Sequence, residues 1–158
     1  MNQAQQSLDT VIELAERRRD EALAALSQAR REAQAAQGQM DQLTAYEAES
    51  QARWRTRASA GVDPAWLMHH REFMAKIHHA IDFQTGVLAQ KQQQTEAAQN
   101  AVHGAERELA TLRQYLARQH EALQQRLMRR EQKQTDEMAQ NAHRRRAAAD
   151  SQFQTFAP

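Results

Sequence analysis

The stretch Ser59-Ala60-Gly61-Val62-Asp63-Pro64 decides how this 158-residue chain folds. Gly61 can end a helix in the left-handed conformation, Asp63 can cap the helix that follows, and Pro64 fits the first turn of that helix. No other break of this strength occurs, because the sequence holds only 4 Gly and 2 Pro. The sequence therefore predicts two long helices joined by one hinge at residues 59–64.

Upstream of the hinge, apolar residues recur at alternating steps of four and three, with one interruption at Arg19. This is the heptad pattern of a coiled coil, and it predicts a first helix from about residue 7 to 58. The expected buried positions are Leu8, Ile12, Ala15, Ala22, Leu26, Ala29, Ala33, Ala36, Met40 and Leu43.

A second heptad stripe follows the hinge and predicts a helix from residue 64 to about 143, with a frayed tail over residues 144–158. Gly86 and Gly104 lie inside it, and each costs only about 1 kcal/mol relative to Ala. The stripe consists of Leu67, His70, Met74, Ile77, Ile81, Gln84, Leu88, Lys91, Thr95, Ala98, Val102, Ala105, Leu109, Leu112, Leu116, Gln119 and Leu123.

A short connection makes consecutive helices antiparallel neighbours. We therefore expect an all-α fold, an antiparallel two-helix coiled-coil hairpin that forms a single domain over residues 1–158, with the second helix longer than the first. Leu43 should lie opposite residues 77–81, and Leu26 opposite residues 95–98. Beyond about Arg118 the second helix has no partner in its own chain, although apolar residues continue there, namely Leu123, Leu127, Met128 and Met138.

Composition and charge exclude several classes of function. Formal charge is +1, so no global field attracts the chain to nucleic acid or anionic lipid. No Cys is present, which removes disulfides and thiolate ligands. The N-terminus lacks the pattern of a signal peptide, and no apolar run approaches the roughly 20 residues of a membrane span. We expect a cytoplasmic protein without membrane insertion.

The side chains suited to chemistry do not form a site. His69, His70, His78 and His79 lack the spacing of three or four residues that puts metal ligands on one helix face. A two-stranded coiled coil also offers no deep pocket for acid–base or nucleophilic catalysis. We therefore expect no cofactor, no metal and no enzymatic activity.

Arginine runs at residues 129–130 and 144–146 make the C-terminal end locally basic, but Glu131, Asp136 and Glu137 are interleaved with them. No aromatic side chain is placed among them to stack on a base. An acidic protein surface is favoured over nucleic acid as their target.

Aromatic residues gather at the start of the second helix. Trp66 is expected to close the hinge end of the coil as a hydrophobic plug. Phe73 neighbours the stripe without belonging to it, so part of its ring should be exposed, as in many protein interfaces. Phe83 follows in the same segment.

Several local patterns, in this order, resemble the FliJ family of flagellar type III export proteins over nearly the whole chain. They are Leu43-x-x-Tyr46, Ser59-Ala60-Gly61, Trp66 followed by Phe73, Ile77, Ala80, Ile81 and Gln84, and the run Arg130-Glu131-Gln132-Lys133-x-x-Asp136-Glu137-Met138-Ala139. The family is similar in shape to the central stalk subunit of rotary ATPases.

The resemblance implies a component of the flagellar export apparatus, cytoplasmic and peripherally associated with the inner membrane. Its partners would be the hexameric export ATPase (FliI-like), the regulator of that ATPase (FliH-like), the export gate protein (FlhA-like) and export chaperones, which it helps to recycle. The gate contact would use Phe73 and Ile77. The ATPase would contact the paired termini and the basic stretch, here Leu8, Ile12, Leu116, Leu123, Arg129, Arg130 and Lys133.

Two other interpretations stay open on the sequence alone. One is an unrelated cytoplasmic coiled-coil adaptor, or a type III secretion stalk or chaperone that serves virulence. The other is a nucleoid-associated protein that uses the arginines, whose DNA binding would weaken steeply with salt.

Overall fold

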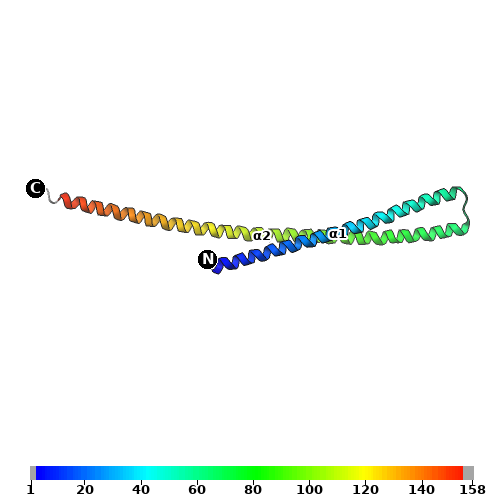
Figure 1. Ribbon diagram of the computed structural model, residues 1–158, viewed down its shortest axis with the longest axis horizontal. Coiled ribbons are helices and arrows are strands. Elements are labelled where there is room, and N and C mark those ends of the chain that lie inside the picture. The colour runs from blue at the N-terminus through cyan, green and yellow to red at the C-terminus, as the bar shows by residue number, and fades with distance from the viewer. Residues whose placement is uncertain (1–2, 155–158) are drawn as a thin grey trace. The chain divides into compact units, whose positions relative to one another are not determined.

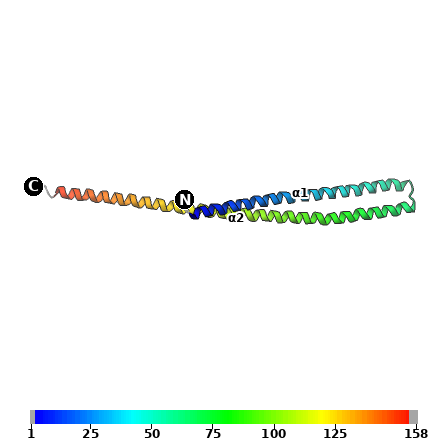
Figure 2. The same cartoon turned by 60° about the horizontal axis from the view of Figure 1, so that its bottom comes forward.

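The computed structural model describes residues 3–154, which form two helices, α1 (Gln3–Ser59) and α2 (Pro64–Gln154). In Figures 1 and 2, α1 lies beside the first part of α2 and runs in the opposite direction. No strand occurs in the described part of the chain. The expected all-α antiparallel two-helix hairpin, with the second helix the longer, is confirmed.

The chain divides into two units, one that ends at Leu109 and one that begins at Ala110. We call them the hairpin unit, which contains α1 and the first part of α2, and the C-terminal unit, which contains the remainder of α2. Within the C-terminal unit, every side chain from residue 117 to 152 is exposed.

α2 continues past residue 143, where the sequence analysis expected it to end, and reaches Gln154. The expected frayed tail over residues 144–158 is therefore helical as far as the structure describes it. No Gly or Pro occurs between residues 144 and 154, and the three alanines at 147–149 are the strongest helix formers. Nothing in this segment breaks the helix.

The turn between the helices has the geometry that its residues favour. The Ala60 N–H donates to the Arg57 carbonyl at 3.1 Å, and the Gly61 N–H donates to the Ala58 carbonyl at 3.2 Å. Gly61 then adopts φ 96°, which a residue without a Cβ tolerates. The Asp63 carbonyl accepts from the Leu67 N–H at 3.1 Å, so α2 begins at Pro64 directly after its cap residue.

Both predicted stripes form the core of the hairpin unit. Within it, all the stripe positions of α1 and those of α2 up to Leu109 are buried or half-buried. Gln119 and Leu123 continue the stripe past Arg118 and are exposed, as expected for a helix without a partner. The buried apolar residues are Ile12, Ala15, Leu26, Ala36, Met74, Ile77, Val102 and Leu109.

Contacts between the helices fix the antiparallel register along the hairpin unit. Far from the turn, Arg18 pairs with Glu108 at 3.4 Å, and Glu32 pairs with Lys91 at 2.9 Å in the middle. Nearer the turn, the Gln84 side-chain amide donates to the Ala36 carbonyl at 2.9 Å. Each contact joins residues at about the same distance from the turn, and this register matches the predicted levels of Leu26 and Leu43.

Glycine substitutions test the helices and the turn separately. An added Cβ at Gly38 or Gly86 would meet no atom within 4 Å. Gly38→Ala and Gly86→Ala should each raise the free energy of unfolding by up to about 1 kcal/mol, because Ala loses less entropy in a helix. Gly61→Ala should lower it by about 1 kcal/mol, because a Cβ is strained at positive φ.

Urea unfolding followed by circular dichroism measures the three free energies. A Gly61→Ala variant as stable as the wild type would show that the turn does not require the positive φ.

Candidate functional site

Stacked aromatic rings close the hairpin unit next to the turn. The His70 ring lies between two indoles, 5.2 Å from Trp54 at an interplanar angle of 19° and 5.6 Å from Trp66 at 7°. The Arg57 guanidinium carbon lies 4.8 Å from the centre of the Trp66 ring, within cation–π range. We call Trp54, Arg57, Trp66 and His70 the aromatic cap.

The sequence analysis placed Trp66 at this end but missed Trp54. The signal was present, because the four-three spacing of α1 continues past Leu43 through Glu47 and Ser50 to Trp54, and all four side chains are half-buried. Because residues 47 and 50 are polar, the continuation of the stripe is not evident from the pattern of apolar residues.

The two residues assigned to the export gate by resemblance lie in different environments. Phe73 is 40% exposed, and its ring meets that of Tyr46 edge to face at 5.9 Å. Ile77 is only 6% exposed and belongs to the core. Phe83, one of the other aromatic residues of this segment, is 69% exposed. Phe73 therefore offers ring surface to the outside, whereas Ile77 packs in the core of the hairpin unit.

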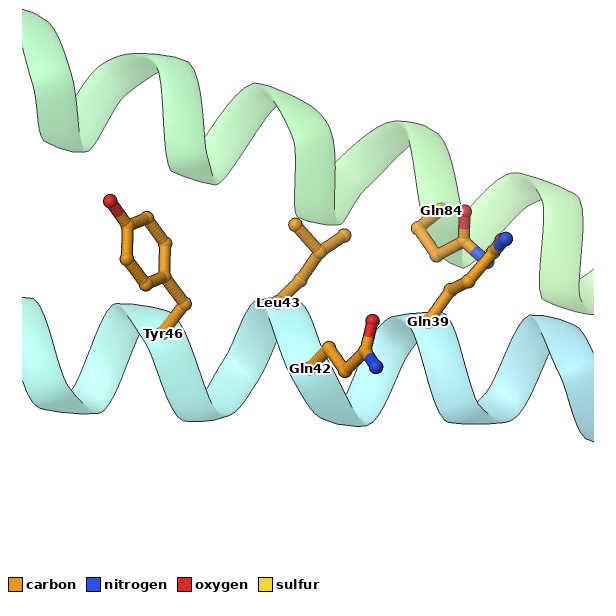
Figure 3. A pocket seen from close by; sticks show the side chains of 5 residues that line it. All are labelled: Gln39, Gln42, Leu43, Tyr46 and Gln84. Atoms are coloured by element: carbon orange, nitrogen blue, oxygen red, sulfur yellow. The ribbon is translucent and has the colours of Figure 1, made fainter.

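A shallow groove opens on the hairpin unit beside Tyr46. Leu43 and Tyr46 of α1 direct their side chains toward α2, and Gln84 of α2 meets Gln39 of α1 (Figure 3). Gln84 is buried, and its side-chain amide donates to the Ala36 carbonyl and, at 3.2 Å, to the Gln39 Oε1. Gln42 completes the lining, which therefore contains no carboxylate, imidazole or amine for acid–base chemistry.

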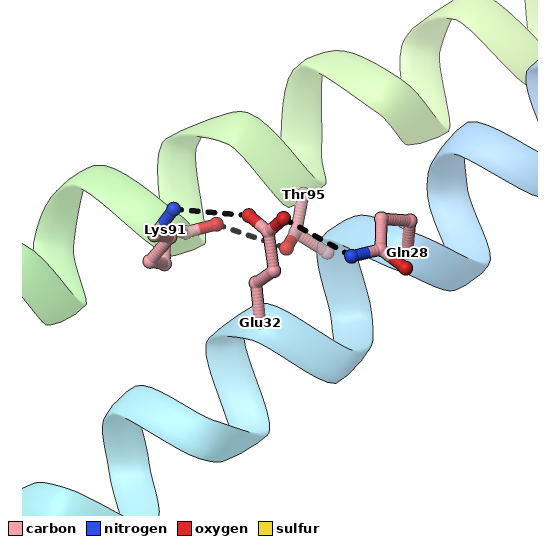
Figure 4. A network of polar contacts seen from close by, with 4 residues as sticks. All are labelled: Gln28, Glu32, Lys91 and Thr95. Carbon is pink, nitrogen blue, oxygen red and sulfur yellow. Dashed lines mark hydrogen bonds and ion pairs between the residues drawn. The ribbon is translucent and has the colours of Figure 1, made fainter.

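A polar network crosses the middle of the hairpin unit (Figure 4). The Lys91 ammonium lies 2.9 Å from Glu32 Oε2, and the Gln28 side-chain amide donates to Glu32 Oε1 at 3.2 Å. The hydrogen bonds from Lys91 and Gln28, together with the charge of Lys91, lower the pKa of the Glu32 carboxyl from its ordinary value of 4.5. Closer to the turn, Glu47 makes another cross-helix contact, to the His78 Nε2 at 2.7 Å.

The residues expected to face the ATPase are divided between the two units. In the hairpin unit, Ile12 is buried in the core and Leu8 is half-buried. In the C-terminal unit, Leu116 is half-buried and Leu123 is 47% exposed. The cations Arg129, Arg130 and Lys133 are exposed.

Charge differs between the units. Residues 110–158 contain 9 Lys and Arg against 5 Asp and Glu, whereas residues 1–109 contain 12 Lys and Arg against 15 Asp and Glu. The C-terminal unit is therefore basic and the hairpin unit slightly acidic, although the formal charge of the whole chain is only +1.

Within residues 3–154 there is no candidate metal site and no candidate membrane span. No three His, Cys, Asp or Glu side chains gather there in a way that could hold a metal ion. Neither described helix includes a segment apolar and long enough to cross a membrane.

The family model described as flagellar FliJ protein matches residues 4–148. The chain belongs to the FliJ family. Membership makes it a component of the flagellar protein export apparatus. Searches against curated proteins and against solved structures return no match for this FliJ-family chain.

The Glu32–Lys91 pair predicts a specific pH dependence. Because the folded state lowers the pKa of Glu32, its contribution to stability is present above the pKa of the unfolded chain and is lost as the pH falls through the folded value. The difference in Tm between wild type and Glu32→Gln should be positive at pH 7 and shrink toward zero below about pH 4.

Thermal melts followed by circular dichroism over this pH range measure the difference. Glu96→Gln is the matched control, because Glu96 is exposed and no ion pair to it is seen in the described part of the chain. A Glu32→Gln difference that stays constant with pH would contradict the assignment.

Proposed function

We propose that this FliJ-family chain is a non-enzymatic coupling element that binds the export ATPase ring through one unit and the export gate through the other. Family membership supports a place in the export apparatus. The observation that carries the rest is the run of exposed side chains over residues 117–152, which includes apolar residues that a folded chain normally covers. Exposed apolar surface of this kind indicates that the unit binds another protein.

The ATPase contact is assigned to the C-terminal unit. Leu116 and Leu123 would supply apolar contacts, and Arg129, Arg130 and Lys133 would supply charge. Leu8 and Ile12, which the resemblance also assigns to this contact, belong to the hairpin unit, where Leu8 is half-buried and Ile12 is buried.

The gate contact is assigned to the hairpin unit near the turn. Phe73 and Tyr46 offer exposed aromatic surface, and the groove beside them is lined by Leu43 and three glutamine side chains. Aromatic side chains at a partly exposed position are favoured anchors of protein interfaces. The buried side chain of Ile77 would hold Phe73 in place.

Coupling requires a stiff element and no chemistry. At 1.5 Å per residue the 57 residues of α1 extend for about 85 Å, and the register contacts bind them to α2. A conformational change in the ATPase ring would then reach the gate as a displacement of this hairpin. Binding of the ATPase regulator and recycling of export chaperones are proposed on family membership. A cytoplasmic location at the inner-membrane export apparatus is also proposed on family membership.

Substitutions at positions 73 and 77 distinguish the loss of a binding contact at the surface from the loss of packing in the core. Phe73→Ala should weaken gate binding at least fivefold, leave ATPase binding unchanged and alter the free energy of unfolding by less than about 1 kcal/mol. Ile77→Ala should lower the free energy of unfolding by about 2 to 4 kcal/mol, because it removes a buried side chain.

Binding of the purified chain to the cytoplasmic part of the gate protein and to the export ATPase is measured alongside urea unfolding. Phe83→Ala is the matched control, because it removes a more exposed ring from the same helix. Equal losses from Phe73→Ala and Phe83→Ala, or no loss from either, would contradict the gate assignment.

A further inference from the structure

Large buried side chains are concentrated at the two ends of the hairpin unit. Next to the turn, α2 buries Met74 and Ile77, and the aromatic cap closes that end. At the end away from the turn, the large buried side chains are Ile12, Leu26, Val102 and Leu109. Each end is therefore held by apolar or aromatic contacts between the helices.

The middle of the hairpin unit lacks such contacts. Residues 85–101 are the longest run in the hairpin part of α2 without a buried side chain. The Glu32–Lys91 pair places residues 27–35 of α1 opposite this run, and the stripe residues of α1 there are Ala29 and Ala33, both half-buried. An Ala side chain removes much less apolar surface from water than Leu or Ile does, so these contacts stabilise the pairing weakly.

Polar side chains occupy the stripe of α2 in the same run. The Thr95 hydroxyl donates to the Lys91 carbonyl at 2.9 Å, so its proton is used within α2 (Figure 4). Lys91 reaches across to Glu32, but their side chains are 29% and 40% exposed, and water screens a pair of this kind. Gly86, which has a lower helix propensity than any residue except Pro, lies in the run as well.

We propose that residues 27–35 of α1 and 85–101 of α2 form a central joint, at which the two helices separate locally and reversibly while both ends stay paired. Separation at the joint exposes little apolar surface and breaks the Glu32–Lys91 pair, whereas separation at either end would expose large apolar side chains to water. A helix segment without its partner loses backbone hydrogen bonds readily, so the joint is the part of the hairpin unit that opens first.

The central joint divides the hairpin unit into two firmly paired segments that can bend or twist against each other. Local opening is a property of the isolated chain and does not depend on which partners bind its ends. Under the proposed function, a displacement applied at one end would be taken up partly in the joint before it reached the other end. The hairpin unit would then couple its two ends elastically.

Amide hydrogen exchange of the full chain, followed by mass spectrometry, measures local opening directly. Peptides from the central joint should exchange at least about tenfold faster than peptides from the two ends, which comprise residues 12–26, 40–54, 70–81 and 102–109. Residues 117–152, where every side chain is exposed, provide a rapidly exchanging reference within the same chain. Equal exchange over the whole hairpin unit, or exchange that rises steadily from the turn to the far end, would overturn the joint.

Substitutions at Thr95 test whether weak packing causes the opening. Thr95→Leu adds apolar surface at a stripe position, whereas Thr95→Ala adds none, although Ala is the better helix former. Thr95→Leu should therefore slow exchange in the joint at least about threefold more than Thr95→Ala does, and leave both ends unchanged. Gln93→Leu is the matched control, because it adds the same side chain at an exposed position, and it should change exchange by less than about twofold.

The other outcomes of these substitutions count against the joint. Equal slowing by Thr95→Leu and Thr95→Ala would show that helix propensity controls the opening. Faster exchange in Thr95→Leu would show that the small side chains permit a tight fit between the helices. Slowing by Gln93→Leu as large as that by Thr95→Leu would show that packing between the helices is not the cause. Each of these results would overturn the proposal.

Removal of the cross-helix ion pair tests what closes the joint. Glu32→Gln should speed exchange in the joint about two- to threefold and leave both ends unchanged, because it removes the charge that pairs with Lys91. Glu96→Gln removes an exposed carboxylate from the same part of the chain and should have no effect. Faster exchange at both ends as well as in the joint would show that the hairpin unit opens only as a whole, which contradicts the proposal.

Discussion

The antiparallel register of α1 on α2 is the constraint on which the other features of the hairpin unit depend. The turn at Gly61 sets the direction, and contacts such as that of the Gln84 amide with the Ala36 carbonyl set the level at which the helices meet. A shift by one residue would rotate the stripes out of contact. The same register buries Ile77 and leaves the neighbouring Phe73 partly exposed.

The polar residues at stripe positions specify the register of the two helices more than they stabilise the hairpin unit. Gln84 is buried and occupies a position where an apolar side chain would pack more favourably. Its two hydrogen bonds are available in only one alignment of the helices, as is the pairing of Lys91 with Glu32. A single polar residue in a coiled-coil seam is known to specify alignment at a cost in stability. In the middle of the hairpin unit, Gln84 and the Lys91–Glu32 pair specify the alignment of the helices in the same manner.

The sequence predicted the features that local patterns determine. The four-three spacing identified the buried stripes, and Gly61 with Pro64 identified the turn. It did not predict that Trp54 stacks on His70, because polar residues at 47 and 50 obscure the stripe, nor that the helix continues beyond residue 143. The heptad spacing also placed Ile77 in the buried stripe and Phe73 beside it with part of its ring exposed, which the structure confirms.

Distance measurement between two spin labels by double electron–electron resonance tests the register most directly. The sequence has no Cys, so cysteines introduced at the exposed Ala25 and Ala101 would be the only labelling sites. This pair lies one heptad inward from the Arg18–Glu108 contact and should give a short distance, unchanged by excess unlabelled protein. Labels at Ala25 and Gln90, displaced by about 16 Å along the axis, should lie farther apart. A shorter distance for Ala25–Gln90, or loss of the Ala25–Ala101 signal on dilution, would contradict the antiparallel hairpin described here.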